Sequence, residues 1–308
     1  MSGEISVRFA SQAQLDIRRI TAELADQQRQ IASGARANDL QGFGAASGRL
    51  LNARSLRSNV DARASILNEL NARLGVQSSA LGQVADASRS LALGIRQAIS
   101  ANDGRGVATE LSMTFASVVN ALNENWNGQP LFAGERQGGG PIRIASLDEL
   151  LTATTPAALY NEAARSQVVD IGESLPIVAS PKASAISEEL FDAMRSLHQM
   201  IVNVGGSLGQ PITGPQETML LEFADTFDAQ ATAFNNEEGR SGQLQKKLED
   251  EQVRLGERSD LLTKVIGDYA DADLGEVSIR ISALTAQYEA AAKTFVDLSR
   301  LSLLNFLR

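Results

Sequence analysis

The sequence predicts a mainly α-helical protein: a long antiparallel helical rod or coiled-coil bundle, with a small β-containing insert in the middle of the chain. The 308 residues are only 5% aromatic, a composition that suits long helices packed through leucine and alanine better than a compact globular core. Apolar residues recur at helical spacing over stretches much longer than ordinary globular helices. The order of these stretches is nearly palindromic, which predicts a chain that folds back and brings its two ends together.

The N-terminal half reads as successive helices. Ile17, Leu24 and Ile31 recur every seven residues, and Ile20 widens the stripe, as in a coiled-coil seam. Glycine, asparagine and aspartate residues at 33–44 and 102–104 break the pattern. The expected helices are 5–33, 45–100 and 107–125.

The middle of the chain has a different composition, with Gly138–Gly140 and several prolines. Short β-like runs cover 130–133, 142–144, 168–171 and 177–179. The Ser146–Glu149 capping box and Thr155-Pro156 each predict the start of a short helix.

Helical periodicity returns in the C-terminal half, over 185–204, 217–269 and 276–307, with a break at 271–275. We therefore expect five segments. They are 1–40 and 271–308, which form a terminal coiled-coil domain, 41–128 and 184–270, which form the rod, and the insert 129–183.

The ending LSRLSLLNFLR is unusually apolar for a chain terminus. The fold-back places it against the stripe of residues 5–33. A single helix pair is marginal, because ordering each residue costs about 1–2 kcal/mol in backbone entropy. We therefore expect these ends to become ordered when neighbouring copies cover them. The candidate assembly residues are Ile17, Leu24, Ile31, Leu284, Tyr288, Phe295, Leu298, Leu301, Leu304 and Phe306.

Composition also excludes several functions. A net charge of −9 argues against binding to nucleic-acid phosphates. The absence of cysteine excludes disulfides and thiol catalysis. The sequence has neither the pattern of a cleaved signal peptide nor an apolar stretch long enough to insert in a membrane.

Few residues suggest chemistry. His198 is the only histidine and has apolar helical neighbours, so a packing role is expected. Gly138–Gly140 lacks the Gly-Lys-Ser/Thr of a phosphate loop. Trp126 is expected to anchor the end of a helix, with a subunit contact as the alternative. No catalytic triad is recognisable, so we expect no enzyme activity, cofactor or metal.

Several segments resemble the bacterial flagellin family. They are the last helix, LTAQYEAAAKTFVDLSRLSLLNFLR, the turn before it, YADADLGEVSIRIS, the N-terminal junction IASGARANDLQGFGAASGRLLNARSLRSNV and the turn NENWNGQPLFAG. Within this family, SQVVDIGESLPIVAS followed by AISEELFDAM is most similar to the hook–filament junction type, hook-associated protein 3. Together with the long helices, the segments that carry the resemblance cover most of the chain outside residues 136–165.

The resemblance implies a structural, self-assembling flagellar subunit that joins hook to filament. It implies export through the flagellar type III apparatus, together with a chaperone, to an extracellular location. Its partners would be itself, the hook-side junction protein and flagellin. Alternatives are a short filament flagellin, a flagellin-like surface-binding protein and an intracellular coiled-coil tether.

Overall fold

The computed structural model describes the backbone of residues 2–170 and 176–306, and the side chains of residues 11–169 and 176–297. Long helices dominate these ranges, and two small antiparallel sheets lie in the middle of the chain. The predicted fold class is confirmed. In chain order the helices are α1 (Ser2–Ser33), α2 (Ser47–Ala101), α3 (Val107–Leu122), α4 (Leu147–Thr152), α5 (Pro156–Leu159), α6 (Ala183–Asn203), α7 (Gly214–Ala270) and α8 (Leu274–Phe306), with a 3-10 turn, η1 (Gly44–Ala46), before α2.

The chain forms two compact units. Unit 1 comprises Met1–Asp61 and Gly256–Arg308, and unit 2 comprises Ala62–Leu255. The helices α2 and α7 each contribute residues to both units. The five-segment division expected from the sequence remains a prediction.

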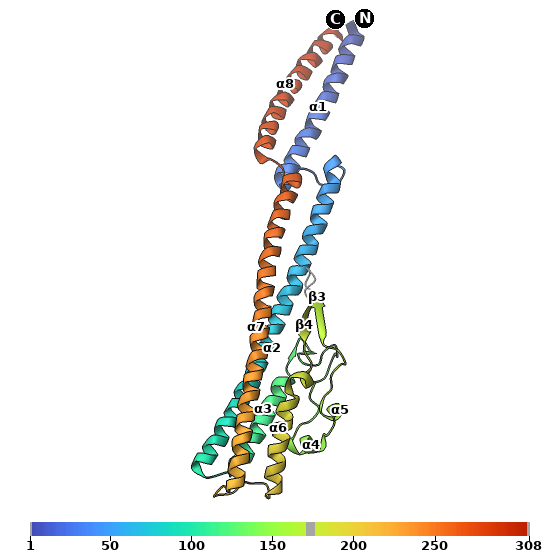
Figure 1. Cartoon of the computed structure of the whole chain (residues 1–308). Helices are drawn as coiled ribbons and strands as arrows, with labels where there is room; N and C mark the ends of the chain where they lie inside the picture. Colours follow the sequence, from blue (N-terminus) through green and yellow to red (C-terminus); the bar gives the residue numbers. More distant parts are fainter. Residues whose placement is uncertain (1, 171–175, 307–308) are drawn as a thin grey trace. The chain divides into compact units, whose positions relative to one another are not determined.

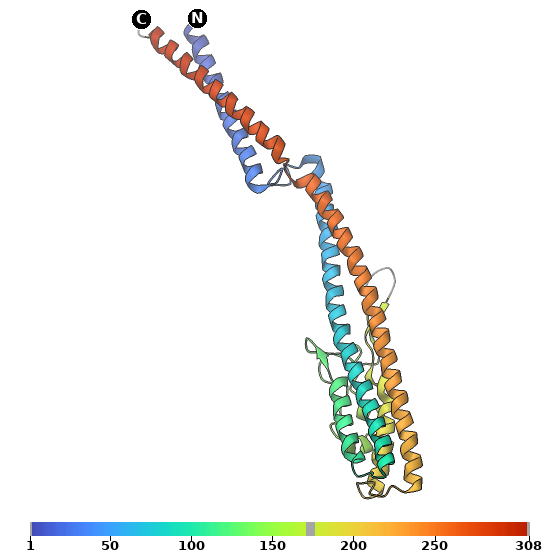
Figure 2. The same cartoon turned by 90° about the vertical axis from the view of Figure 1, so that its left-hand side faces the viewer.

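Unit 1 contains the terminal helices. In both views α1 and α8 lie side by side, and the start of α1 is near the end of α8 (Figures 1 and 2). The initial part of α2 and the final part of α7 complete this unit, where Leu50 and Val60 are buried.

Unit 2 holds the larger hydrophobic core. Residues of α2, α3, α6 and α7 surround it, together with Phe132 from the loop after α3. The ring of Phe191 lies 6.1 Å from that of Phe115 and 6.2 Å from that of Tyr160, in edge-to-face geometry. Such pairs add to the stabilisation from burial alone.

The sheets are smaller than the sequence predicts. Strand β1 (Asn125–Trp126) pairs with β2 (Gln129–Pro130), and β3 (Gln167–Asp170) pairs with β4 (Pro176–Ser180). In the β-like run 130–133 only Pro130 belongs to a strand, and the run 142–144 contains none. Each run otherwise makes one isolated bridge, Ala133 with Lys182 and Ile142 with Tyr160. Ile171, expected to end a strand, lies outside the described residues.

The backbone partners of these two runs explain the difference. The Ile142 amide donates to Oδ1 of Asn123 at 2.9 Å, and the Phe132 carbonyl accepts from the amide of Ala183 at 2.7 Å. Residues in loops and at helix ends therefore form the hydrogen bonds to these backbone groups that a neighbouring strand would form in a sheet.

The short helices begin where the sequence predicts. Ser146 caps α4 by accepting from the amide of Glu149 at 3.2 Å, and Pro156 is the first residue of α5. The predicted capping box is confirmed at its serine.

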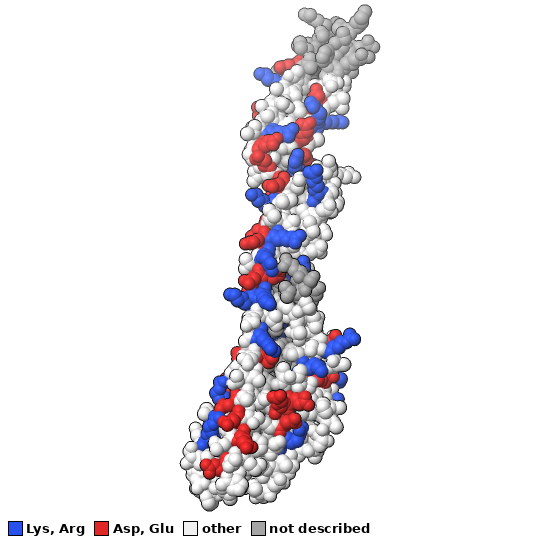
Figure 3. All heavy atoms as spheres, in the orientation of Figure 1, with Lys and Arg blue, Asp and Glu red and all other residues white. Residues whose placement is uncertain are grey.

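Charged side chains of both signs are interspersed over the long helices, and acidic side chains gather over α6 (Figure 3). On one helix pair of unit 2, Arg96 of α2 contacts Asp225 and Asp228 of α7 at 2.9 and 2.5 Å. Because these pairs are exposed, they contribute little to stability.

Candidate assembly interface

The contact between α1 and α8 is a narrow apolar seam. Ile20 on α1 and Val277 and Leu284 on α8 are buried. The predicted residues Ile17 and Leu24 are half-buried. Their spacing follows from the heptad pattern, which keeps one face of each helix toward its partner.

Small and polar residues interrupt this seam. Ala13, Gln27 and Gln30 on α1 are half-buried, and these positions add little buried apolar surface. Each fully buried Leu or Ile contributes about 1.5–3 kcal/mol. Within the described side chains of this pair, few apolar residues are fully buried, and the marginal stability expected from the sequence remains a prediction.

Other predicted assembly residues are at the edge of the seam. Ile31, in the last turn of α1, is 43% exposed, and Tyr288 is 39% exposed. Phe295 is half-buried. The side chains of Leu298, Leu301, Leu304 and Phe306 lie outside the described residues.

The heptad pattern missed several apolar side chains of this helix pair. Leu15 is 59% exposed and Ile279 is 74% exposed, and Val296 is also exposed. Leu15 lies about 140° around its helix from Ile20, and Ile279 lies about the same angle from Leu284, so both are on outer faces. A search for apolar residues opposite the heptad stripe would have found them.

A backbone bridge ties together the two segments that connect these helices to α2 and α7. Ala35 and Asp271 form an antiparallel bridge. The amide of Arg36 donates to the carbonyl of Ala270 at 2.7 Å, and that of Ala272 donates to the carbonyl of Gly34 at 2.9 Å. The sequence predicts a break in the helical pattern at each of these two segments, but it gives no sign that the segments pair with each other.

Local geometry favours this bridge. Gly34 has φ +68°, a conformation that glycine adopts without a steric cost and that ends α1. Asp273 caps α8, because its Oδ1 accepts from the amides of Gly275 and Glu276 at 2.9 and 3.1 Å.

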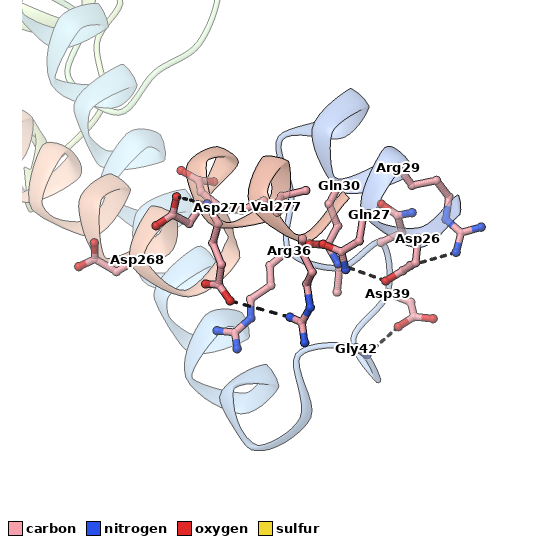
Figure 4. A pocket seen from close by; sticks show the side chains of 16 residues that line it. Asp26, Gln27, Arg29, Gln30, Arg36, Asp39, Gly42, Asp268, Asp271 and Val277 are labelled. Atoms are coloured by element: carbon pink, nitrogen blue, oxygen red, sulfur yellow. Dashed lines mark hydrogen bonds and ion pairs between the residues drawn. The ribbon is translucent and has the colours of Figure 1, made fainter. Parts of the chain in front are cut away.

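A polar cleft of about 820 Å³ lies beside the bridge, within unit 1. Figure 4 shows Asp26, Arg29 and Gln30 on one side of it, with Asp268 and Asp271 on another. Arg29 and Gln30 both donate to Asp26, at 3.0 and 3.2 Å. Within the described ranges, no group of three or more histidine, aspartate or glutamate residues has an arrangement that could hold a metal ion.

Two single residues have the packing roles expected for them. His198 is half-buried on α6, and its Nε2 lies 3.0 Å from Oδ1 of Asp148. Trp126 is half-buried and packs against the core of unit 2. Of the helices in the described part of the chain, none is both long enough and apolar enough to span a bilayer.

No protein-family model matches the sequence, and a comparison with curated proteins finds no match. Solved structures do match. One is a Vibrio parahaemolyticus protein assigned as a flagellar hook-associated protein, with a TM-score of 0.59 and 16% identity over 76% of this chain and 99% of that one. Another is Bacillus cereus FlgL, with a TM-score of 0.51 and 12% identity over 65% of this chain and 98% of that one. The resemblance predicted from the sequence is confirmed in the fold: this chain has the fold shared by these two flagellar proteins.

Proposed function

We propose that this protein is an extracellular, self-assembling structural subunit of the bacterial flagellum that joins the hook to the filament. The observation that carries the proposal is the set of exposed apolar side chains on the α1–α8 pair, Leu15, Ile279 and Val296. Apolar side chains that remain exposed on a thin helix pair are a natural surface for neighbouring subunits. The fold shared with two flagellar proteins supports the location.

Energetics favour assembly among many copies over simple dimerisation. Burial of one such side chain contributes about 1.5–3 kcal/mol. Bringing two proteins together costs about 4–15 kcal/mol in lost motion. A single pairwise contact is therefore weak, and growth is favourable where an added subunit gains several neighbours at once. Packing of the ends is then coupled to assembly.

In this proposal the partners are further copies of the chain, the hook-side junction protein and flagellin. The chain reaches them through the type III export apparatus, with a chaperone covering the apolar ends beforehand. The role is mechanical, so no enzyme activity is proposed.

Antibody labelling of intact cells tests the location. A thin band at the outer end of the hook is the expected result. Labelling along the whole filament would identify a flagellin instead, and cytoplasmic labelling would overturn the proposal.

Deletion of Leu298–Arg308 tests the assembly surface. We expect unit 2 to stay folded, as measured by circular dichroism and thermal unfolding, while assembly is lost. Hydrogen exchange on the intact monomer provides a second measurement, because residues 298–308 should exchange rapidly before assembly. Full protection of these amides in a dilute monomer would contradict the coupling of order to assembly.

A further inference from the structure

The polar cleft of unit 1 carries an excess of negative charge. Its lining includes six carboxylates and three arginines, a net formal charge of −3. Four of these carboxylates have partners: one pairs with Arg29, one lies 3.8 Å from Arg280, and two accept hydrogen bonds from backbone amides. Among the described residues, the carboxylates of Asp268 and Asp271 (Figure 4) have neither an ion pair nor a hydrogen bond, and Arg36 has no ion pair. The two aspartates are therefore available to a cation from outside the chain.

A surface of opposite charge also belongs to unit 1, on the first turns of α2. The sequence from 40 to 60 contains three arginines and no aspartate or glutamate. Arg49 and Arg54 are exposed, and neither has an ion pair or a hydrogen bond from its side chain among the described residues. Leu51 and Leu56 are 47% and 46% exposed. We call these four residues of α2 the basic patch.

The cleft and the basic patch are chemically complementary. A guanidinium group pairs with a single carboxylate through two parallel hydrogen bonds. It therefore suits two separate aspartates, whereas a metal ion needs a convergent group of ligands, which the described residues do not provide. Arg49 and Arg54 do not line the cleft of their own chain, so the contact needs a second copy.

The two surfaces are also different from each other, which decides what kind of assembly they can form. A contact between unlike surfaces of identical chains is heterologous. It leaves a free cleft at one end and a free basic patch at the other, so each added copy can receive another. Such a contact repeats in a ring or an open helix and does not stop at a dimer.

We propose that the basic patch of one copy docks into the polar cleft of a second copy, where Arg49 and Arg54 pair with Asp268 and Asp271. The two leucines of the patch are covered at the rim of the cleft. This inference rests on the proposed self-assembly and adds a polar contact to the apolar one on the α1–α8 pair. Complementary charges set orientation and partner choice more than affinity, so this contact selects how neighbouring copies are oriented.

Charge reversal on either side of the contact tests the proposal, with sedimentation of the full-length chain as the measurement. Arg49→Glu/Arg54→Glu places like charges against the cleft, and Asp268→Arg/Asp271→Arg places like charges against the basic patch. Each double variant alone should raise the critical concentration for assembly at least about tenfold.

An equal mixture of the two double variants should assemble near the wild-type concentration. In the mixture each reversed patch meets a reversed cleft, and each native patch meets a native cleft. Recovery in the mixture would also show that both variants are folded. Arg136→Glu/Arg165→Glu is the matched control, because it changes the net charge equally at two exposed arginines of unit 2 that have no ion pair among the described residues. It should assemble like the wild type.

Other outcomes separate this inference from the proposed function. If the wild type assembles and each double variant alone assembles equally well, the docking contact is wrong and the proposed function stands. If each variant fails alone and the mixture fails as well, the patch and the cleft do not meet. If the wild type does not assemble at any concentration, the proposed self-assembly is wrong, and this inference is wrong with it.

Discussion

Gly94 of α2 and Glu110 of α3 are packed so closely that a Cβ atom on Gly94 would overlap the carboxylate of Glu110. Partial burial raises the pKa of Glu110 above its ordinary value, because the charged form loses hydration. Small residues therefore do more in this protein than let helices approach, since this glycine also makes room for a carboxyl group. A pH dependence of stability follows from the contact.

Glu110→Gln tests this dependence. A raised pKa means that the folded state binds the proton more tightly than the unfolded state does. Glu110 thus contributes stability at pH values below its unfolded pKa of about 4.3, and this contribution is lost as the pH rises through the raised folded value. Urea unfolding measured across this pH range should show that the free energy of unfolding of the wild type declines as the pH rises. The decline should be smaller for Glu110→Gln. Identical pH profiles of the two proteins would contradict the assignment.

Gly94→Ala should release the same carboxyl group. The added methyl group occupies the place of the carboxylate, which is the end of a flexible side chain and can turn toward water. We expect the pKa of Glu110 to fall to its ordinary range, as measured by NMR titration of its carboxyl carbon. Alanine should also stabilise the helix interior by about 0.5–1 kcal/mol. An unchanged pKa would show that burial by α2 is not the cause of the shift.

Leu284→Ala and Ile279→Ala separate folding from assembly on the same helix. The buried Leu284 belongs to the seam, so its truncation should destabilise the α1–α8 pair by about 2–5 kcal/mol. Ile279 is exposed, so Ile279→Ala should change the free energy of unfolding of the monomer by less than about 0.5 kcal/mol. The same substitution should raise the critical concentration for assembly.

Sedimentation and hydrogen exchange measure the two effects, and Ser282→Ala, another exposed position of α8, is the control. If Ile279→Ala assembled like the wild type, the outer face of α8 would not be part of the contact.

Gly34→Ala tests the bridge between Ala35 and Asp271. The positive φ of Gly34 is strained for alanine by about 1–2 kcal/mol, so the amides of Arg36 and Ala272 should exchange faster with solvent. Gly256→Ala lies within α7, where apart from its chain neighbours and the nearby backbone of the same helix no atom lies within 4 Å of the added methyl group, and should instead be neutral or stabilising. Equal exchange rates in the wild type and Gly34→Ala would show that glycine is not needed there.

Local patterns in the sequence predicted much of this fold. Periodicity placed the long helices, and Ser146 and Pro156 marked short ones, because these signals depend on near neighbours in the chain. The β-like runs 130–133 and 142–144 form only the end of β2 and isolated bridges, since backbone partners such as Asn123 come from elsewhere in the chain. The heptad stripe likewise identified one face of α1, and helical periodicity identified α8, but neither pattern said anything of Leu15 or Ile279 on the outer faces.

The bridge between Ala35 and Asp271 has a mechanical consequence. Two separate backbone segments connect the α1–α8 pair to the rest of the chain, one through Ala35 and the other through Asp271. Without a link between them, a force could strain either segment alone. Hydrogen bonds in both directions across the bridge join them in parallel. A tensile force on one terminal helix is therefore shared by both connections.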